Sequence, residues 1–272
     1  MKPLLYAYVY TMIFCAPMAI VTVLYSSYLT AAFDTVDHDI LLTRLKFKFS
    51  ICRHCPWMVS FVSYQPHTIY LNRWKKKSQS RELKCGVNQG SVPGPILYLL
   101  YTTPLADILR YHEMQFHIYA DDIQLCISSS TNNDVELTKT VGKIEECLSD
   151  LDKWMSLNKL NKLNKDKTEL LYVYSKHNPQ QSLPPIRFGQ DIIQPSQFAW
   201  NIGVIFDSTM TMLPHISSIS RSASYHLRNM ARIRKFLSTK TTEILVHAFV
   251  SSEVNHCNSL LYNVPKCALK KL

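Results

Sequence analysis

Tyr119-Ala-Asp-Asp122 stands between two short apolar runs, residues 116–118 before it and residues 123–127 after it. Two apolar runs around a short polar tip predict a β-hairpin that carries the paired aspartates at its turn. Adjacent carboxylates repel each other, and burial disfavours their ionised form. A divalent cation offsets both effects, because Mg²⁺ takes charged oxygen ligands and shares them with substrate phosphates. Exposed turns also accept Asp readily, so the rest of the chain decides between a metal-binding hairpin and a plain turn.

The composition is that of a chain with a hydrophobic core and an excess of positive charge. Of its 272 residues 47% are hydrophobic, and the formal net charge is +10. Such a balance favours a polyanionic partner or an acidic membrane surface. The stretch from His215 to Leu272 holds nine Lys/Arg against two Glu, so it carries +7 of this charge.

Eight cysteines are scattered along the chain, and only Cys52 and Cys55 have the spacing of a zinc-ligand pair. A structural zinc site needs four ligands, so this pair alone does not predict one. Scattered thiols are typical of a reduced intracellular protein, and no disulfide-linked partner is expected.

The N-terminal stretch from Pro3 to Phe33 contains no charged residue. It is longer than the roughly 20 apolar residues that cross a bilayer, and a signal peptide is a second interpretation. Tyrosines spread through the stretch and serines dilute its distal half, which favours a buried strand over residues 20–29. Residues 1–19 stay ambiguous.

Periodicity and turn residues predict the remaining elements. We expect helices over residues 37–46, 96–109 and 134–158 and from residue 216 onward, strands over 168–174 and 201–206, a helix and a strand within 57–72, a basic hairpin or loop over 73–84, and a loop-rich passage over 179–195. The helix over 134–158 has the clearest apolar face, formed by Leu137, Val141, Ile144, Leu148, Leu151 and Met155.

The helix from residue 216 has two different faces at 100° per residue. Its apolar side is formed by Ile216, Ile219, Ala223, Leu227, Met230 and Leu237. A narrow basic stripe, named here the cation row, lies almost opposite and consists of Arg221, Arg228, Arg232 and Lys235. Simple solvation explains such a row about as well as contact with the phosphates of a nucleic-acid duplex.

Four segments in order carry a resemblance to a known family. They read Leu29-Thr-Ala-Ala-Phe-Asp-Thr-Val-Asp-His-Asp-Ile-Leu-Leu42, Gly86-Val-Asn-Gln-Gly-Ser-Val-Pro-Gly-Pro95, Tyr119-Ala-Asp-Asp122 and Leu163-Asn-Lys-Asp-Lys-Thr-Glu169. Together they resemble reverse transcriptases of non-LTR (LINE-type) retrotransposons, most of all the CR1/L2-type elements of vertebrates. Asn201-Ile-Gly-Val-Ile-Phe-Asp207 looks like the segment that joins palm to thumb in this family, and residues 230–262 resemble its thumb.

The resemblance implies an α+β fold, with a palm made of an antiparallel sheet backed by helices and followed by a helical thumb. It divides the chain into an uncertain apolar segment (residues 1–19), a palm (20–200) and a connection with a thumb-like region (201–272). The fingers motifs of the family are not found, so a truncated domain is expected.

The implied reaction is RNA-templated addition of deoxynucleoside triphosphates to a DNA primer, with two Mg²⁺ ions that clamp the attacking and leaving oxygens. By resemblance, Asp121 is the principal metal ligand and Asp122 its neighbour, and both are catalytic residues. Lys167 matches the lysine that protonates the leaving pyrophosphate. Phe33 takes the steric-gate position, and Gln89 and Gly90 lie where the nucleotide and template stack. The cation row is expected to contact the nucleic-acid backbone.

One departure from the family pattern concerns the reaction itself. The first motif of the family begins with a metal-bridging aspartate, whereas this chain has Tyr28 at that position. A neutral phenol does not replace a carboxylate between two Mg²⁺ ions, because hard cations select charged oxygen. We therefore expect a remnant of a reverse transcriptase, located in the nucleus or cytoplasm, that has lost catalysis.

Two other interpretations stay open. A non-catalytic nucleic-acid-binding protein would use the cation row. A membrane-anchored protein would use the N-terminal apolar segment, although the hydrophobicity that falls after Tyr25 counts against a membrane partner.

Overall fold

The computed structural model describes the chain in segments. These are residues 20–28, 33–51, 66–67, 70–71, 76–77, 81–82, 85–87, 91–119, 122–130, 134–160, 168–174, 183–201, 203–262, 264–270 and 272. Within strand β1 (Ile20–Tyr28) and strands β2 to β5 the description concerns the backbone. The first 19 residues, whose structure the sequence leaves ambiguous, lie outside the described part of the chain.

A five-stranded sheet forms the centre of the fold, in the order β11-β8-β1-β7-β6. Strand β1 lies in the middle and pairs antiparallel with β7 (Asp122–Ser130) and with β8 (Glu169–Val173). Strand β6 (Gln115–Tyr119) pairs antiparallel with β7 at one edge, and β11 (Pro195–Ser196) runs parallel to β8 at the other. The strand predicted over residues 20–29 and the one predicted over 168–174 are therefore confirmed.

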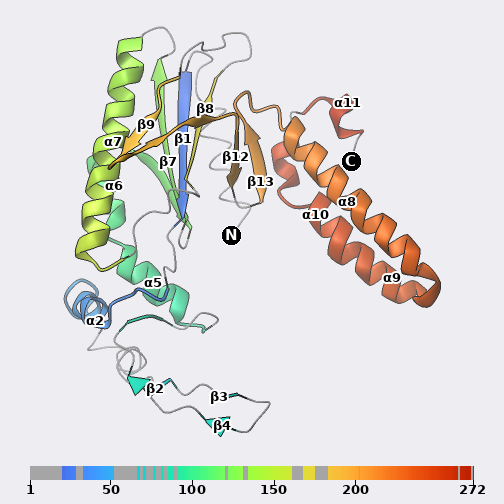
Figure 1. The fold of residues 1–272 in the computed structure, drawn as a ribbon, viewed down its shortest axis with the longest axis horizontal. Helices are drawn as coiled ribbons and strands as arrows, with labels where there is room; N and C mark the ends of the chain where they lie inside the picture. The colour runs from blue at the N-terminus through green and yellow to red at the C-terminus, as the bar shows by residue number, and fades with distance from the viewer. Residues whose placement is uncertain are drawn as a thin grey trace.

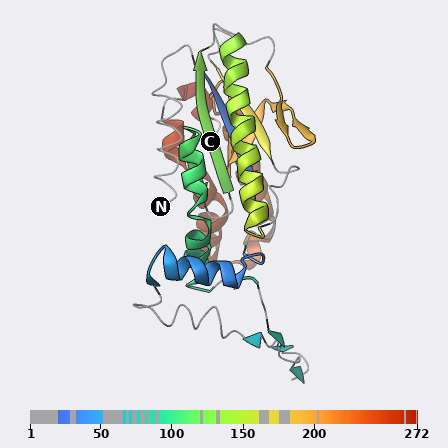
Figure 2. The ribbon, with the colours of Figure 1, turned by 90° about the vertical axis from the view of Figure 1, so that its left-hand side faces the viewer.

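Helices cover one face of this sheet (Figures 1 and 2). Helix α7 (Asp134–Leu157) runs along it, and the six apolar residues predicted for its inner face are all buried. They pack with Ile123, Leu125, Leu170 and Tyr172, which point from β7 and β8 toward the helices. The helix exists because its apolar residues recur at three- and four-residue steps, which places them on one side of the helix.

The prediction of one continuous helix over residues 96–109 is wrong. The structure has two helices, α5 (Gly94–Thr102) and α6 (Leu105–Tyr111), with Pro104 between them as the N-cap of α6. Proline inside a helix lacks an N–H donor and clashes with the preceding turn. Helix α2 (His38–Phe47) matches its prediction, and Asp37 caps its start by accepting the Ile40 N–H at 3.1 Å.

Two β-hairpins in the structure differ from what the sequence pattern predicts. The passage expected to be loop-rich contains β9 (Ile186–Phe188) paired with β10 (Asp191–Ile193). The single strand expected over 201–206 is wrong, because β12 (Phe198–Asn201) and β13 (Val204–Asp207) form a hairpin. Gly203 makes the reversal with φ +83°, a backbone conformation that favours glycine. This β12–β13 hairpin lies between the sheet and the C-terminal helices (Figure 1).

The basic segment around residues 66–82 forms paired backbone outside the main sheet. Strand β2 (Pro66–His67) pairs with β5 (Arg81–Glu82), and β3 (Tyr70–Leu71) pairs with β4 (Lys76–Lys77). The hairpin or loop expected over residues 73–84 is therefore misplaced as a hairpin, because the strands within that range, β4 and β5, pair with β3 and β2 that precede it.

The C-terminal part is helical. Its elements are α8 (Leu213–Ile233), η2 (Arg234–Phe236), α9 (Thr239–Val246), η3 (His247–Ser251), α10 (Ser252–Val254), η4 (Asn258–Leu261) and α11 (Lys266–Leu269). Helix α8 buries Ile216, Ile219, Ala223 and Met230 as predicted, whereas Leu227 is 47% exposed. The fold therefore has two hydrophobic cores. The first lies between the sheet and helices α5 to α7, and the second packs Ile216 against Leu171 and Val173 on the other face of the sheet.

Candidate functional site

The hairpin predicted from the paired aspartates is formed by β6 and β7. Tyr119 pairs with Asp122 at its tip, and residues 120 and 121 between them lie outside the described part of the chain. The same register on the other side of β7 places Tyr28 of β1 opposite Asp122. Position 28 is therefore next to the aspartate hairpin, which is where the first-motif residue is expected.

The residues at this point do not fit a two-metal centre. Directly opposite residues of an antiparallel pair have Cβ atoms about 5 Å apart, so carboxylates at positions 28 and 122 would be close enough to bind the same metal ion. A tyrosine at position 28 supplies a neutral phenol, whereas Mg²⁺ bridging takes charged oxygen. Among the described residues, no group of three or more His, Cys, Asp or Glu is arranged to hold a metal ion.

Phe33 lies in a turn that contacts helix α5. Its ring lies 4.8 Å, centroid to centroid, from the ring of buried Tyr98, at an interplanar angle of 30°. Its carbonyl accepts the Val87 N–H at 2.8 Å. The predicted nucleotide-side residues Gln89 and Gly90 follow Val87 and lie outside the described residues, as does Lys167.

Gly86 fixes this turn against the glycine-containing segment. Its N–H donates to the Val36 carbonyl at 2.7 Å, and its own carbonyl lies 2.7 Å from His38 Nε2. Its φ is +97°, and a Cβ added there would lie 3.2 Å from the Asp34 carbonyl oxygen. Both a left-handed backbone and a close approach therefore require glycine here.

Asp37 connects the same turn to the end of helix α7. Its carboxylate caps α2 and accepts from Lys159 Nζ at 2.7 Å. Burial raises the pKa of Asp37, but the hydrogen bonds from Lys159 and Ile40 outweigh it and leave that pKa below its ordinary value. Lys159 precedes the segment that contains Lys167. The first and second family segments are thus held together by backbone hydrogen bonds, and Lys159 ties the first of them to the end of α7, a link that the sequence did not reveal.

The sheet face that points away from helices α5 to α7 carries a row of polar residues next to the Tyr28–Asp122 pair, and sequence analysis missed this row. Glu169 and Gln124 are both register partners of Ser26, two residues from the Tyr28–Asp122 pair. Gln124, buried, donates from Nε2 to Asn201 Oδ1 at 2.6 Å. Glu169 Oε2 accepts the Trp200 N–H at 2.5 Å, and burial raises the pKa of its carboxyl group. Glutamine within an otherwise apolar strand, in residues 123–127, was the available signal.

The cation row lies on the outer side of the C-terminal helices. Arg221, Arg228 and Arg232 on α8 and Lys235 in η2 are all exposed, and no carboxylate among the described residues forms a salt bridge with them. Tyr225, 61% exposed, lies on α8 between Arg221 and Arg228. Cations interleaved with an exposed aromatic ring provide both phosphate contact and a stacking surface.

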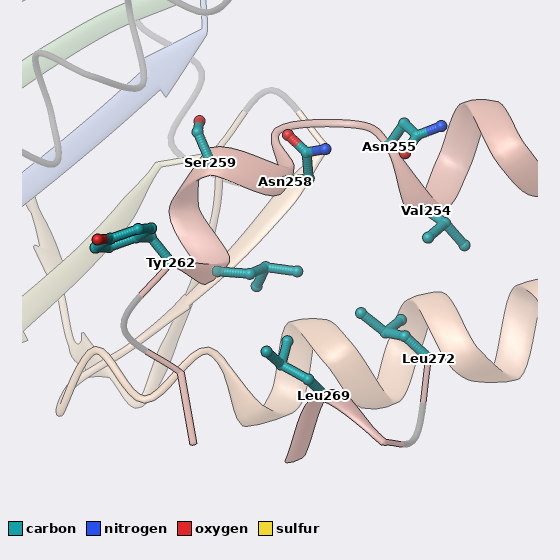
Figure 3. Close-up of a pocket in the computed structure, with 8 residues that line it drawn as sticks. Val254, Asn255, Asn258, Ser259, Tyr262, Leu269 and Leu272 are labelled. Carbon is teal, nitrogen blue, oxygen red and sulfur yellow. The ribbon is translucent and has the colours of Figure 1, made fainter. Parts of the chain in front are cut away.

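A cavity of about 670 Å³ lies among the C-terminal helices (Figure 3). It is lined by Val254, Asn255, Asn258, Ser259, Leu261, Tyr262, Leu269 and Leu272. This lining is mainly apolar and holds no carboxylate, imidazole or thiol, so it offers no group for the implied reaction. In the described part of the chain, no helix is both long enough and apolar enough to span a membrane.

Comparison with known proteins gives a family match. Residues 20–241 match the family described as reverse transcriptase (RNA-dependent DNA polymerase). A probable RNA-directed DNA polymerase from transposon BS of Drosophila melanogaster is 30% identical over 220 residues, 79% of this chain and 23% of the relative. A second one, from transposon X-element of the same organism, is 24% identical over 219 residues, 78% of this chain and 23% of the relative. The chain therefore spans about a quarter of the length of these curated relatives.

Two solved structures are also similar. One is apo telomerase from Candida tropicalis truncated from its C-terminal domain, with a TM-score of 0.42 and 11% identity over 76% of this chain and 37% of that one. The other is telomerase from Candida albicans in complex with a TWJ fragment of telomeric RNA. It has a TM-score of 0.38 and 14% identity, and covers 99% of this chain and 43% of that one.

Proposed function

The chain belongs to the reverse transcriptase (RNA-dependent DNA polymerase) family, and from this premise we propose that it is a catalytically silent member of a LINE-type, non-LTR retrotransposon lineage. It keeps the palm sheet and the thumb helices and binds nucleic-acid duplex. The observation that carries the proposal is the register of β1 and β7, which sets Tyr28 opposite Asp122. The division into residues 1–19, 20–200 and 201–272 remains a prediction.

The lost activity is RNA-templated DNA synthesis. In the family, Mg²⁺ supplies charge neutralisation for the transferred phosphoryl group. Asp121 and Asp122 are the remaining candidate ligands, and the metal-bridging carboxylate that would complete the set is absent. Without it, RNA template, DNA primer and deoxynucleoside triphosphates still have a surface to bind, but this chain lacks one of the carboxylates that would hold Mg²⁺.

Primer extension on an RNA template with Mg²⁺ tests this proposal. We expect no extension by the unmodified chain, and weak but measurable extension after Tyr28→Asp. The matched control is Y28D combined with Asp122→Asn, which restores one carboxylate and removes the other, and should again be silent. Robust Mg²⁺-dependent synthesis by the unmodified chain would overturn the proposal.

The duplex binding in this proposal, which needs no catalysis, is supported by the cation row. Its members are exposed and form no salt bridge among the described residues, so no carboxylate competes with a phosphate for them. Arginine and lysine release condensed counterions when they bind phosphates, so affinity should fall steeply with salt. We place such binding in the nucleus or cytoplasm, where the duplex would be found.

A further inference from the structure

The β12–β13 hairpin lies between the sheet and helix α8, and its two edges are held by different parts of the molecule. Trp200 and Ile205 are register partners in this hairpin. The Trp200 N–H donates to Glu169 Oε2 at 2.5 Å, and the Ile205 N–H donates to His215 Nδ1 at 3.4 Å. Opposite residues of an antiparallel pair either exchange hydrogen bonds or point both N–H groups outward. This pair points outward, one N–H toward the palm and one toward the thumb.

We infer that Glu169 and His215 are positioning residues that lock this hairpin between palm and thumb and so hold the cation row at a fixed place relative to Asp122. The inference rests on the proposed duplex-binding function and specifies which residues organise that surface. Each acceptor belongs to a rigid element, Glu169 to the sheet and His215 to the first turn of α8.

Neighbouring contacts support the same lock. Gln124 of β7 donates to Asn201, the residue after Trp200, so the palm holds two successive residues of β12. On the thumb side, the His256 ring lies 3.3 Å from where a Cβ on Gly203 would be. Asp207, at the end of β13, accepts the Thr211 N–H at 3.0 Å and the Met212 N–H at 2.8 Å. Hydrogen bonds therefore hold the connection from sheet to α8 on both of its sides, at β12 from the sheet and at β13 from the α8 side.

The chemistry of His215 gives the lock a distinctive pH dependence. It is 3% exposed, and burial, with a smaller contribution from the nearby His256, lowers its pKa to about 4. A neutral imidazole accepts at Nδ1 only while its proton is on Nε2, and a protonated imidazole has no acceptor. His256, in the segment between α10 and η4, is the neighbouring group whose charge adds to the effect of burial on the pKa of His215.

Amide hydrogen exchange on the full chain tests the lock at single residues. His215→Phe keeps a ring but removes the acceptor, and should raise exchange at Ile205 about tenfold, the worth of one hydrogen bond. His215→Asn offers an amide oxygen in its place and should restore protection. Glu169→Ala should act likewise at Trp200, and Glu169→Gln should not. Glu145→Ala is the matched control, because Glu145 accepts an amide of a different hairpin, Arg187 N–H at 2.6 Å.

Two further readouts separate positioning from ordinary packing. In the unmodified chain, protection at Ile205 should fall as the pH drops through about 4, whereas H215N should show no such step. The affinity for an RNA/DNA duplex should drop several-fold in H215F and recover in H215N. Unchanged exchange at Ile205 in H215F overturns the inference, and so does faster exchange with unchanged duplex affinity. Absence of duplex binding by the unmodified chain defeats the proposed function, whereas the exchange step still decides the lock.

Discussion

At the scale of single residues, position 28 carries the proposal that the chain is catalytically silent. Asp122 and Tyr28 are opposite each other in the β1–β7 ladder, and Tyr28 stands where the resemblance leads us to expect an aspartate. A phenol reaches several ångströms farther from the backbone than an aspartate carboxylate does, and near neutral pH it lacks the carboxylate's full negative charge. Under the proposed function, tyrosine at position 28 removes a metal ligand while the register of β1 against β7 is kept.

A prediction at this scale concerns the titration of His215. Because its folded pKa is about 4, below its unfolded value of about 6.5, the unfolded state binds the proton first as the pH falls. The stability linked to this group is complete above about pH 6.5 and is lost progressively down to about pH 4. Between pH 7 and pH 5 the loss should be on the order of 2 kcal/mol in urea unfolding. H215N should remove this component, and an identical pH dependence in the variant would contradict the prediction.

A second residue-scale prediction compares two glycines. Gly86→Ala should cost about 1–2 kcal/mol, because φ is +97° and the new Cβ would lie 3.2 Å from the Asp34 carbonyl. Gly142→Ala is the matched control: it lies inside α7, and a Cβ there meets nothing within 4 Å. Alanine in a helix interior should instead stabilise by about 0.5–1 kcal/mol. Thermal unfolding of both variants provides the measurement, and equal effects would refute the argument for Gly86.

At the scale of elements, the local sequence pattern predicted helices and strands correctly where one face of the element is buried. Helix α7 was predictable because its apolar residues repeat with the helical period, and β1 because β-branched residues are concentrated in it. The β12–β13 hairpin was not, because the reversal depends on one left-handed glycine, Gly203, inside an apolar run. The Asp37–Lys159 pair was also beyond reach, since the two residues are 122 positions apart in the sequence.

An element-scale prediction follows from Asp37, which both caps α2 and pairs with Lys159. Asp37→Ala loses both interactions and should destabilise by about 1–2 kcal/mol. Asp37→Asn keeps a capping oxygen and loses only the ion pair, so its effect should be much smaller, because the Lys159 side chain is 64% exposed and solvent screens the pair. Lys159→Met should match D37N. Urea unfolding in 0.05 M and 1 M salt is the check, and a D37N effect that persists at high salt would count against a charge interaction.

At the scale of the whole molecule, the cation row and the aspartate hairpin lie in different parts of the fold. The aspartate hairpin is in the central sheet, whereas the cation row is on helices α8 and η2 across the β12–β13 hairpin (Figure 1). Sequence motifs gave the family, because short segments carry it, whereas the roles of the site residues stay predictions. How those segments lie relative to one another depends on contacts such as Trp200 with Glu169, which no local pattern encodes.

The last prediction tests whether this separation matters for binding. Neutralising Arg221, Arg228 and Arg232 to Gln should weaken binding to an RNA/DNA duplex and reduce the slope of log affinity against log salt by about 1 per cation in phosphate contact. The control removes the same charge from α7, at exposed Lys139, Lys143 and Lys153, on the helix that covers the other face of the sheet. Because counterion release is local to the phosphates that are contacted, the control should leave the slope nearly unchanged. Equal loss of slope in both triple variants, measured by fluorescence anisotropy over a salt series, would mean that net charge rather than the cation row drives binding.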